Sequence, residues 1–197
     1  MERRKVILVT DGDTAAKKAV ESAAKNIGGR CISCSAGNPT ILTGAEIVEH
    51  IKTAPYDPVV VMVDDCGGDS AGRGETAMET ILNHPDIETL GVVAVASNGK
   101  DKGHIKVDCS FTKDGKRVEH AVDKYGNDTV ASVIKGDTLS VLKNMNVPII
   151  VGIGDPGKMD GKDDVILGAP ITTAALKEIL KVGSSSGLGG SEEKTNH

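Results

Sequence analysis

Three uninterrupted apolar runs, each ending at a small polar turn, constrain the fold of this chain more than any other feature. The runs cover residues 6–9, 59–63 and 149–153. Strands that read as continuous apolar runs, without polar alternation, are typical of parallel sheets covered by helices on both faces. The sequence therefore predicts an α/β fold of the Rossmann-like or Toprim-like three-layer kind, with a mostly parallel sheet.

Helical periodicity fills the intervals between these runs. In residues 14–27 the apolar side chains recur at steps of three and four, which predicts an amphipathic helix that ends at Gly28 and Gly29. Thr43 is expected to cap a second helix over residues 44–53. Further helices are expected over about 75–83, from 137 or 138 to 143, and over about 172–181, with additional strands over 30–35 and 91–97.

One segment shows the alternation of an antiparallel pair instead. Ile105, Val107, Cys109 and Phe111 alternate with polar residues, and a second alternating stretch follows Asp114 and Gly115. An Asp-Gly pair between two such stretches is a strong signal for a type I′ turn. We expect an antiparallel hairpin that extends the sheet edge or protrudes from it.

Length and composition indicate one domain. A chain of 197 residues fits a single domain, here placed at residues 1–182. Residues 183–197 are rich in Gly and Ser and then polar, so they are expected to form a flexible tail.

The charge pattern argues against some classes of partner. The net charge is −5, aromatic residues make up 2% of the chain, and the lysines form no basic stripe, so no nucleic acid is expected. No apolar run approaches the roughly 18 residues of a membrane span, and the first residues do not resemble a signal peptide. The four cysteines and the scattered histidines are expected to be structural, and the cysteines reduced.

The sharpest chemical signal is the pair Asp11 and Asp13, which flanks Gly12 at the start of the first predicted helix. Two carboxylates at this spacing can share a hard cation such as Mg²⁺. The alternative is structural, because an aspartate at a helix start caps free N–H groups. The sequence leaves both alternatives open.

Two more polar turns follow strand ends. Asp64 and Asp65 are adjacent, so their side chains are expected to point to opposite sides, with at most one facing a shared crevice. Gly154 and Asp155 begin a stretch dense in Gly, Asp and Lys that fits either a binding loop or a solvated connection. Ligands of open α/β sheets bind outside the carboxyl ends of the strands, so this edge is the predicted binding rim for a cation or a positively charged partner.

Residues 6–24 resemble the D-x-D strand–turn–helix of Toprim domains. That resemblance implies an Mg²⁺-dependent phosphotransferase or nuclease, with Asp11 and Asp13 joined by Asp64 or Asp65. The usual Glu-Gly element of Toprim domains is missing upstream. A Toprim-like enzyme of this kind is one of two functions that the sequence suggests.

A longer resemblance covers about residues 4–182. The segments Ile-Leu-Val-Thr-Asp-Gly-Asp at 7–13, Gly-Asn-Pro-Thr at 37–40, Val-Ala-Val-Ala-Ser at 93–97 and Pro-Ile-Thr-Thr at 170–173 resemble, in order, the soluble stage V sporulation protein AE of the SpoVA group. Residues 66–72 and the tail match less well.

This resemblance implies a non-enzymatic role in endospores. It implies an accessory protein at the spore inner membrane, peripheral to it, that works with other SpoVA-group proteins in the uptake and release of dipicolinic acid. It brings no catalytic residue and no cofactor. The acidic strand ends are then a contact rim for a basic partner or for Ca²⁺.

Overall fold

The computed structural model describes residues 2–65, 72–98, 103–136 and 138–186. Its strands are β1 (Arg4–Val9), β2 (Arg30–Cys31), β3 (Val59–Met62), β4 (Ile87–Val95), β5 (His104–Lys106), β6 (Cys109–Phe111), β7 (Arg117–Val118), β8 (Val133–Lys135) and β9 (Ile150–Ile153). Its α-helices are α1 (Thr14–Asn26), α2 (Gly44–Thr53), α3 (Arg73–Leu82) and α4 (Pro170–Ser186).

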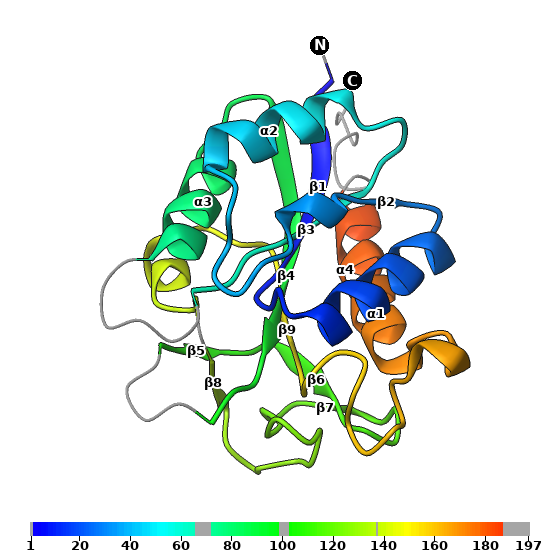
Figure 1. Cartoon of the computed structure of the whole chain (residues 1–197). Helices are drawn as coiled ribbons and strands as arrows, with labels where there is room; N and C mark the ends of the chain where they lie inside the picture. Colours follow the sequence, from blue (N-terminus) through cyan, green and yellow to red (C-terminus); the bar gives the residue numbers. More distant parts are fainter. Residues whose placement is uncertain (1, 66–71, 99–102, 137, 187–197) are drawn as a thin grey trace, which may run out of the picture.

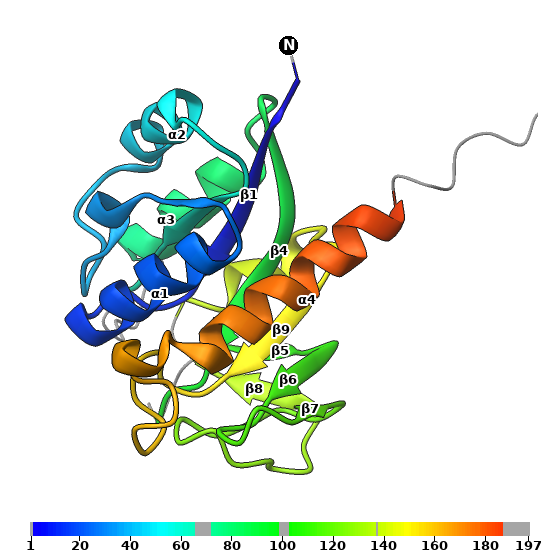
Figure 2. The same cartoon turned by 90° about the vertical axis from the view of Figure 1, so that its right-hand side faces the viewer.

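The predicted α/β class is confirmed. Seven strands form one sheet in the order β2-β3-β1-β4-β9-β6-β7, and every pairing in it is parallel except that of β6 with β7. Figure 1 shows the sheet between two helical layers, with α2 and α3 on one side and α1 and α4 on the other. Figure 2 shows α1 and α4 lying together across one face.

Alternate residues of each buried strand enter two separate cores. Val6 and Leu8 pack in the core that contains α2 and α3, whereas Ile7 and Val9 pack in the core that contains α1 and α4. All four side chains are 0% exposed. The apolar run is continuous because successive side chains leave the strand on opposite faces, and both faces are covered.

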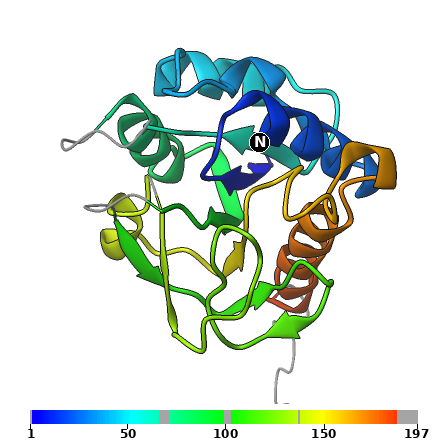
Figure 3. The ribbon, with the colours of Figure 1, turned by 60° about the horizontal axis from the view of Figure 1, so that its bottom comes forward.

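Buried hydroxyl groups continue the hydrogen bonding of the strands past their carboxyl ends. Thr10 Oγ1 accepts from Val95 N at 2.9 Å, and Thr40 Oγ1 accepts from Asp64 N at 2.8 Å. These bonds hold the chain in place where each strand gives way to a loop. These bonds fix Thr10, Thr40 and the ends of β3 and β4 at the carboxyl edge of the sheet, the edge towards which Figure 3 is turned.

Both predicted cap signals are present in the helices. Asp13 Oδ1 accepts from Ala16 N at 2.8 Å at the start of α1. Thr43 and Glu46 form a capping box at the start of α2, each accepting from the other's backbone N–H. These reciprocal bonds satisfy N–H groups that the first helical turn leaves without partners.

The predicted hairpin is confirmed as β6 and β7, and it lengthens the sheet at its edge. The sequence did not separate it from a second, two-stranded antiparallel sheet made of β5 and β8, whose partners are about 30 residues apart along the chain. Non-local pairing of this kind leaves no local turn signal.

Several predicted boundaries were wrong. The strand expected over 30–35 ends at Cys31 and is followed by a 3₁₀ turn, η1 (Ser33–Ser35), where Ser35 turns inward and its Oγ accepts from Met62 N. The helix expected up to residue 143 is a 3₁₀ turn, η2 (Val141–Asn144), and residue 137 lies outside the described residues. Helix α4 continues to Ser186, past the predicted domain end at 182, and the rest of the predicted tail lies outside the described residues.

Candidate functional site

The carboxyl ends of β1, β3, β4 and β9 meet around a small polar cavity of about 130 Å³. Four carboxylates and one ammonium group line it. The lining residues are Thr10, Asp11, Asp13, Asn38, Asp64, Val95, Ala96, Ser97, Asp155 and Lys158. We call the side chains of Asp11, Asp13, Asp64 and Asp155 the acidic rim.

Asp11 is a strongly perturbed acid of the rim. Burial raises its pKa to about 7, and the charges of Asp13 and Asp64 act in the same direction. The backbone N–H of Asp13, which donates to Asp11 Oδ1 at 3.1 Å, and the charge of Lys158 oppose this shift. At neutral pH the Asp11 carboxyl therefore exchanges between its neutral and its charged form.

Asp13 is held in its charged form. One carboxylate oxygen caps α1, and the other accepts from Lys158 Nζ at 2.6 Å. Burial alone would raise the pKa of Asp13, but the hydrogen bonds from Lys158 and from the helix start lower it below its usual value. Asp13 thus acts as a helix cap and as the partner of a lysine.

Sequence reasoning did not single out Lys158, which is the cation of the rim. Besides its contact with Asp13, Lys158 Nζ lies 3.5 Å from Asp155 Oδ2. Gly157 packs so closely on α1 that a Cβ there would lie 2.8 Å from Ala15 O. Only a glycine at this point lets the loop after β9 lie against α1, and that contact brings the next residue, Lys158, to Asp13.

The buried carboxylate of Asp163 anchors the same loop, the one that follows β9. Its side chain accepts from Gly157 N at 2.8 Å, from Ile171 N at 2.7 Å, and from both the backbone and the hydroxyl of Thr172. It is 0% exposed. Asp163 therefore ties the loop to the start of α4 and fixes the position of Lys158.

The pair Asp64 and Asp65 separates. Asp64 is buried, at 4% exposed, and lines the cavity. Asp65 turns away and caps α3, accepting from Gly74 N at 2.6 Å and from Glu75 N at 2.9 Å. The structure thus brings Asp64 to the predicted rim and gives Asp65 a structural role.

Gly154 and Asp155 follow β9 directly. A Cβ on Gly154 would lie 2.6 Å from Gly126 N and 2.7 Å from Lys124 O, so this position admits only glycine without a backbone shift. Asp155 lines the cavity, and burial raises the pKa of its carboxyl despite the opposing charge of Lys158. Of this pair, Asp155 belongs to the acidic rim and Gly154 positions it.

No ready-made cation site accompanies these carboxylates. Among the described residues, no group of three or more His, Cys, Asp or Glu side chains is placed to hold a metal ion. Because both Asp13 oxygens already have partners, a cation bound between Asp11 and Asp13 would have to displace Lys158. The predicted magnesium or calcium site therefore stays a prediction.

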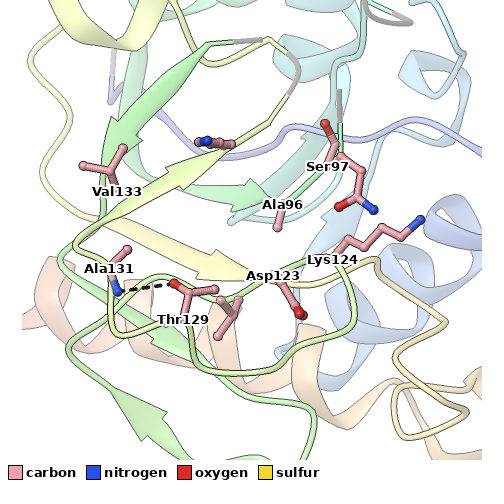
Figure 4. Close-up of a pocket in the computed structure, with 10 residues that line it drawn as sticks. Ala96, Ser97, Asp123, Lys124, Thr129, Ala131 and Val133 are labelled. Atoms are coloured by element: carbon pink, nitrogen blue, oxygen red, sulfur yellow. Dashed lines mark hydrogen bonds between the residues drawn. The ribbon is translucent and has the colours of Figure 1, made fainter. Parts of the chain in front are cut away.

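A second groove, of about 290 Å³, adjoins the polar cavity of the acidic rim, and Ala96 and Ser97 line both. Figure 4 shows it between the end of β4, the segment 122–131 and β8. Its walls are mainly apolar, with lysines at its margin. Nothing in the sequence pattern pointed to this groove, because its walls come from three separate segments.

The remaining candidates have structural surroundings. Cys31 and Cys109 are buried free thiols, and burial raises the pKa of Cys31 to about 12, so it is not a reactive thiolate. Cys34 is exposed and free, and Cys66 lies outside the described residues. His120 Nδ1 lies 3.4 Å from Asp128, and His84 Nδ1 accepts from Asp86 N.

A comparison with protein families bears on the biological role of this protein. The model of the family described as SpoVAE, stage V sporulation protein AE1, matches residues 5–183. The chain belongs to this family. The match runs from the second residue of β1 to residue 183 in α4, and it confirms the resemblance seen in the sequence. Comparisons with the curated proteins and with the solved structures gave no match.

Family membership implies a role in sporulation, and with it the spore as the place of action. A non-enzymatic protein fits such a family. In the part of the chain that the structure describes, none of the helices is long and apolar enough to cross a membrane.

Proposed function

We propose that this protein is a non-enzymatic accessory component of a SpoVA-type assembly at the spore inner membrane. In this proposal it lies peripheral to the membrane, contacts other SpoVA-group proteins, and serves the uptake and release of dipicolinic acid in sporulation and germination. The observation that carries the proposal is the family match over residues 5–183.

The acidic rim is the surface that we propose for the partner. It combines four carboxylates with one lysine, which is itself paired with Asp13 and Asp155. The excess of negative charge favours a basic partner surface and repels a dianion such as dipicolinate. The rim is therefore proposed for protein contact and not for direct binding of dipicolinate.

Gene deletion tests the proposed role. Spores without the gene should contain less dipicolinic acid, or release it more slowly on germination, and the wild-type gene should restore both. Complementation with Asp155→Lys should fail to restore them, whereas Asp86→Lys should succeed, because Asp86 is exposed at the opposite edge of the sheet, just before β4. Unchanged content and release in the deletion strain would refute the proposal.

Copurification tests the proposed surface separately. A tagged wild-type chain should retain SpoVA-group proteins from spore membranes, Asp155→Lys should lose them, and Asp86→Lys should keep them. Equal capture by both variants would remove the rim from the interface, even if the deletion strain shows a defect.

The predicted cation is tested by calorimetry with Mg²⁺ and Ca²⁺. Because Lys158 occupies Asp13 Oδ2, wild-type protein should bind these ions weakly, and Lys158→Met should bind them about tenfold more tightly or better. Absence of saturable binding to both proteins would exclude the rim as a cation site.

A further inference from the structure

The groove beside β4 is lined by polar groups whose arrangement indicates a ligand site. Its ten lining residues are Ala96, Ser97, Asn98, Val122, Asp123, Lys124, Thr129, Ala131, Val133 and Lys135. A ligand site is mostly apolar, with a few polar groups that fix the ligand's orientation.

Two side chains of the groove, Asp123 and Thr129, already have hydrogen-bond partners within the protein. Asp123 accepts from Tyr125 N, from Asn127 N and from Asn127 Nδ2, all at 2.9–3.0 Å, and so closes the turn that it begins. Thr129 Oγ1 donates to Ala121 O at 2.7 Å and accepts from Ala131 N at 3.4 Å, the bond drawn in Figure 4. Neither side chain needs a ligand.

Three other side chains of the groove, those of Lys124, Lys135 and Ser97, can donate hydrogen bonds to a ligand. Neither Lys124 nor Lys135 forms an ion pair with any carboxylate of the described residues, and the ammonium of Lys124 lies 4.9 Å from the centre of the Tyr125 ring. Ser97 Oγ is buried and has no hydrogen-bond partner among the described residues. An unsatisfied donor set of two ammonium groups and a hydroxyl favours a ligand that brings negatively charged acceptors.

The apolar wall lies beside these donors. Ala96, Val122, Ala131 and Val133 supply it, and Figure 4 shows Ala96, Ala131 and Val133 around the opening. Val133 and Lys135 are two residues apart on β8, so they share one face of the strand. An apolar group that rests on Val133 thus has the stem and ammonium of Lys135 next to it on the same face.

We propose that this groove binds a small organic acid, with its apolar body on Ala96, Val122, Ala131 and Val133 and its carboxylate paired with Lys135, with Lys124 as the second cation. A volume of about 290 Å³ is at the lower limit for ligand pockets, so the ligand is smaller than a nucleotide. The inference rests on the groove alone and does not depend on the proposed role at the membrane.

Benzoate is the probe for this site, because it joins a compact apolar ring to one carboxylate. Titration of the full chain, followed by calorimetry and by amide chemical shifts, should show saturable binding with shifts around residues 96–98 and 122–135. Benzamide has the same shape without the charge, and acetate has the charge without the ring. Both should bind at least about tenfold more weakly, the loss expected for a charged hydrogen bond or for the buried ring.

Variants locate the site. Lys135→Met keeps the apolar stem, removes the charge and should weaken benzoate binding about tenfold or more. Lys106→Met is the matched control: Lys106 is also exposed, lies opposite Val133 on the neighbouring strand β5 and does not line the groove, so it should leave the affinity unchanged. Ala131→Phe should fill the groove and abolish binding. Circular dichroism and thermal unfolding check that each variant folds. If Ala131→Phe does not fold, the comparison of Lys135→Met with Lys106→Met tests the proposal.

Three results would overturn the inference. Equal affinities for benzoate and benzamide would remove the role of charge. Equal losses in Lys135→Met and Lys106→Met would show only a general effect of surface charge. Absence of saturable shifts around the groove at millimolar benzoate would show that no such site exists.

Discussion

Lys158 Nζ lies 2.6 Å from Asp13 Oδ2, although the two residues are 145 positions apart in the chain. The contact joins the loop after the β9 strand to the cap of the first helix. It also places one positive charge among four carboxylates at the edge of the sheet. This pair determines how the acidic rim responds to mutation and to pH.

Replacing Lys158 by Met should raise the pKa of Asp11 above its present value of about 7, because the charge of Lys158 now opposes that shift. The pKa of Asp13 should rise as well, since it loses its strongest hydrogen bond. Carboxyl carbon shifts followed by NMR during a pH titration measure both values. The exposed Lys162, which has no ion pair with the described carboxylates, provides the control: Lys162→Met should move neither.

Asp11→Asn should change how stability depends on pH. Because the folded pKa of Asp11 is above its unfolded value of 3.8, the folded state binds the extra proton between these values, and its stability falls as pH rises from about 4 to about 7. The asparagine variant keeps an acceptor for Asp13 N but has no charge to bury. It should be more stable than the wild type at pH 8, by about 1–4 kcal/mol, and should lose that advantage at pH 4.

Urea unfolding at a series of pH values measures this difference. Asp13→Asn should instead be less stable than the wild type at pH 8. The folded pKa of Asp13 is lowered, so its charged form stabilises the folded state, and this stabilisation is lost as the solution becomes acidic. If the difference in free energy of unfolding between Asp11→Asn and the wild type is the same at pH 4 and pH 8, Asp11 does not titrate in the way proposed.

Asp163→Ala should destabilise the protein by about 2–4 kcal/mol, because it leaves the buried donors of Gly157, Ile171 and Thr172 without an acceptor. The neighbouring Asp164→Ala is the control. Among the described residues, the side chain of Asp164 accepts one hydrogen bond, from Ile166 N at the exposed η3 turn (Val165–Leu167), so its loss should cost about 1 kcal/mol or less. Thermal unfolding of both variants gives the comparison, and equal losses would contradict the proposed anchoring role of Asp163.

Gly154→Ala should be destabilising, since its Cβ would meet the backbone at Gly126 N and Lys124 O. Gly183→Ala should instead stabilise by up to about 1 kcal/mol, because Gly183 lies within α4 and its Cβ would lie at an ordinary 3.5 Å from Leu90. Chemical denaturation measures both. A neutral Gly154→Ala variant would show that the 124–126 turn can move, and that the groove beside it is not rigid.

Local signals in the sequence were sufficient for most elements. The spacing of Ala16, Val20 and Ala23 predicted α1, and Thr43 predicted the cap of α2. The boundaries failed where a distant contact took over, as at Ser35, whose hydroxyl bonds to Met62 N and turns the chain out of the strand. Propensity along one segment contains no information about such partners.

The sequence alone determined the class of the fold and the edge at which the acidic residues gather. A continuous apolar run followed by a polar turn has the same physical meaning wherever it lies in the chain: a strand buried on both faces that ends at the carboxyl edge of the sheet. That inference needs no long-range information. The same is true of the order of family motifs, which the match over residues 5–183 bears out.

Only the tertiary structure decided what each acidic residue does there. Asp64 and Asp65 are neighbours in the chain, yet one lines the cavity and the other caps α3. Lys158 became the cation of the rim because Gly157 lets its loop lie on α1 and Asp163 holds it there. Side-chain direction, burial and charge pairing depend on which segments meet in space, and those meetings are set by packing between residues far apart in the sequence.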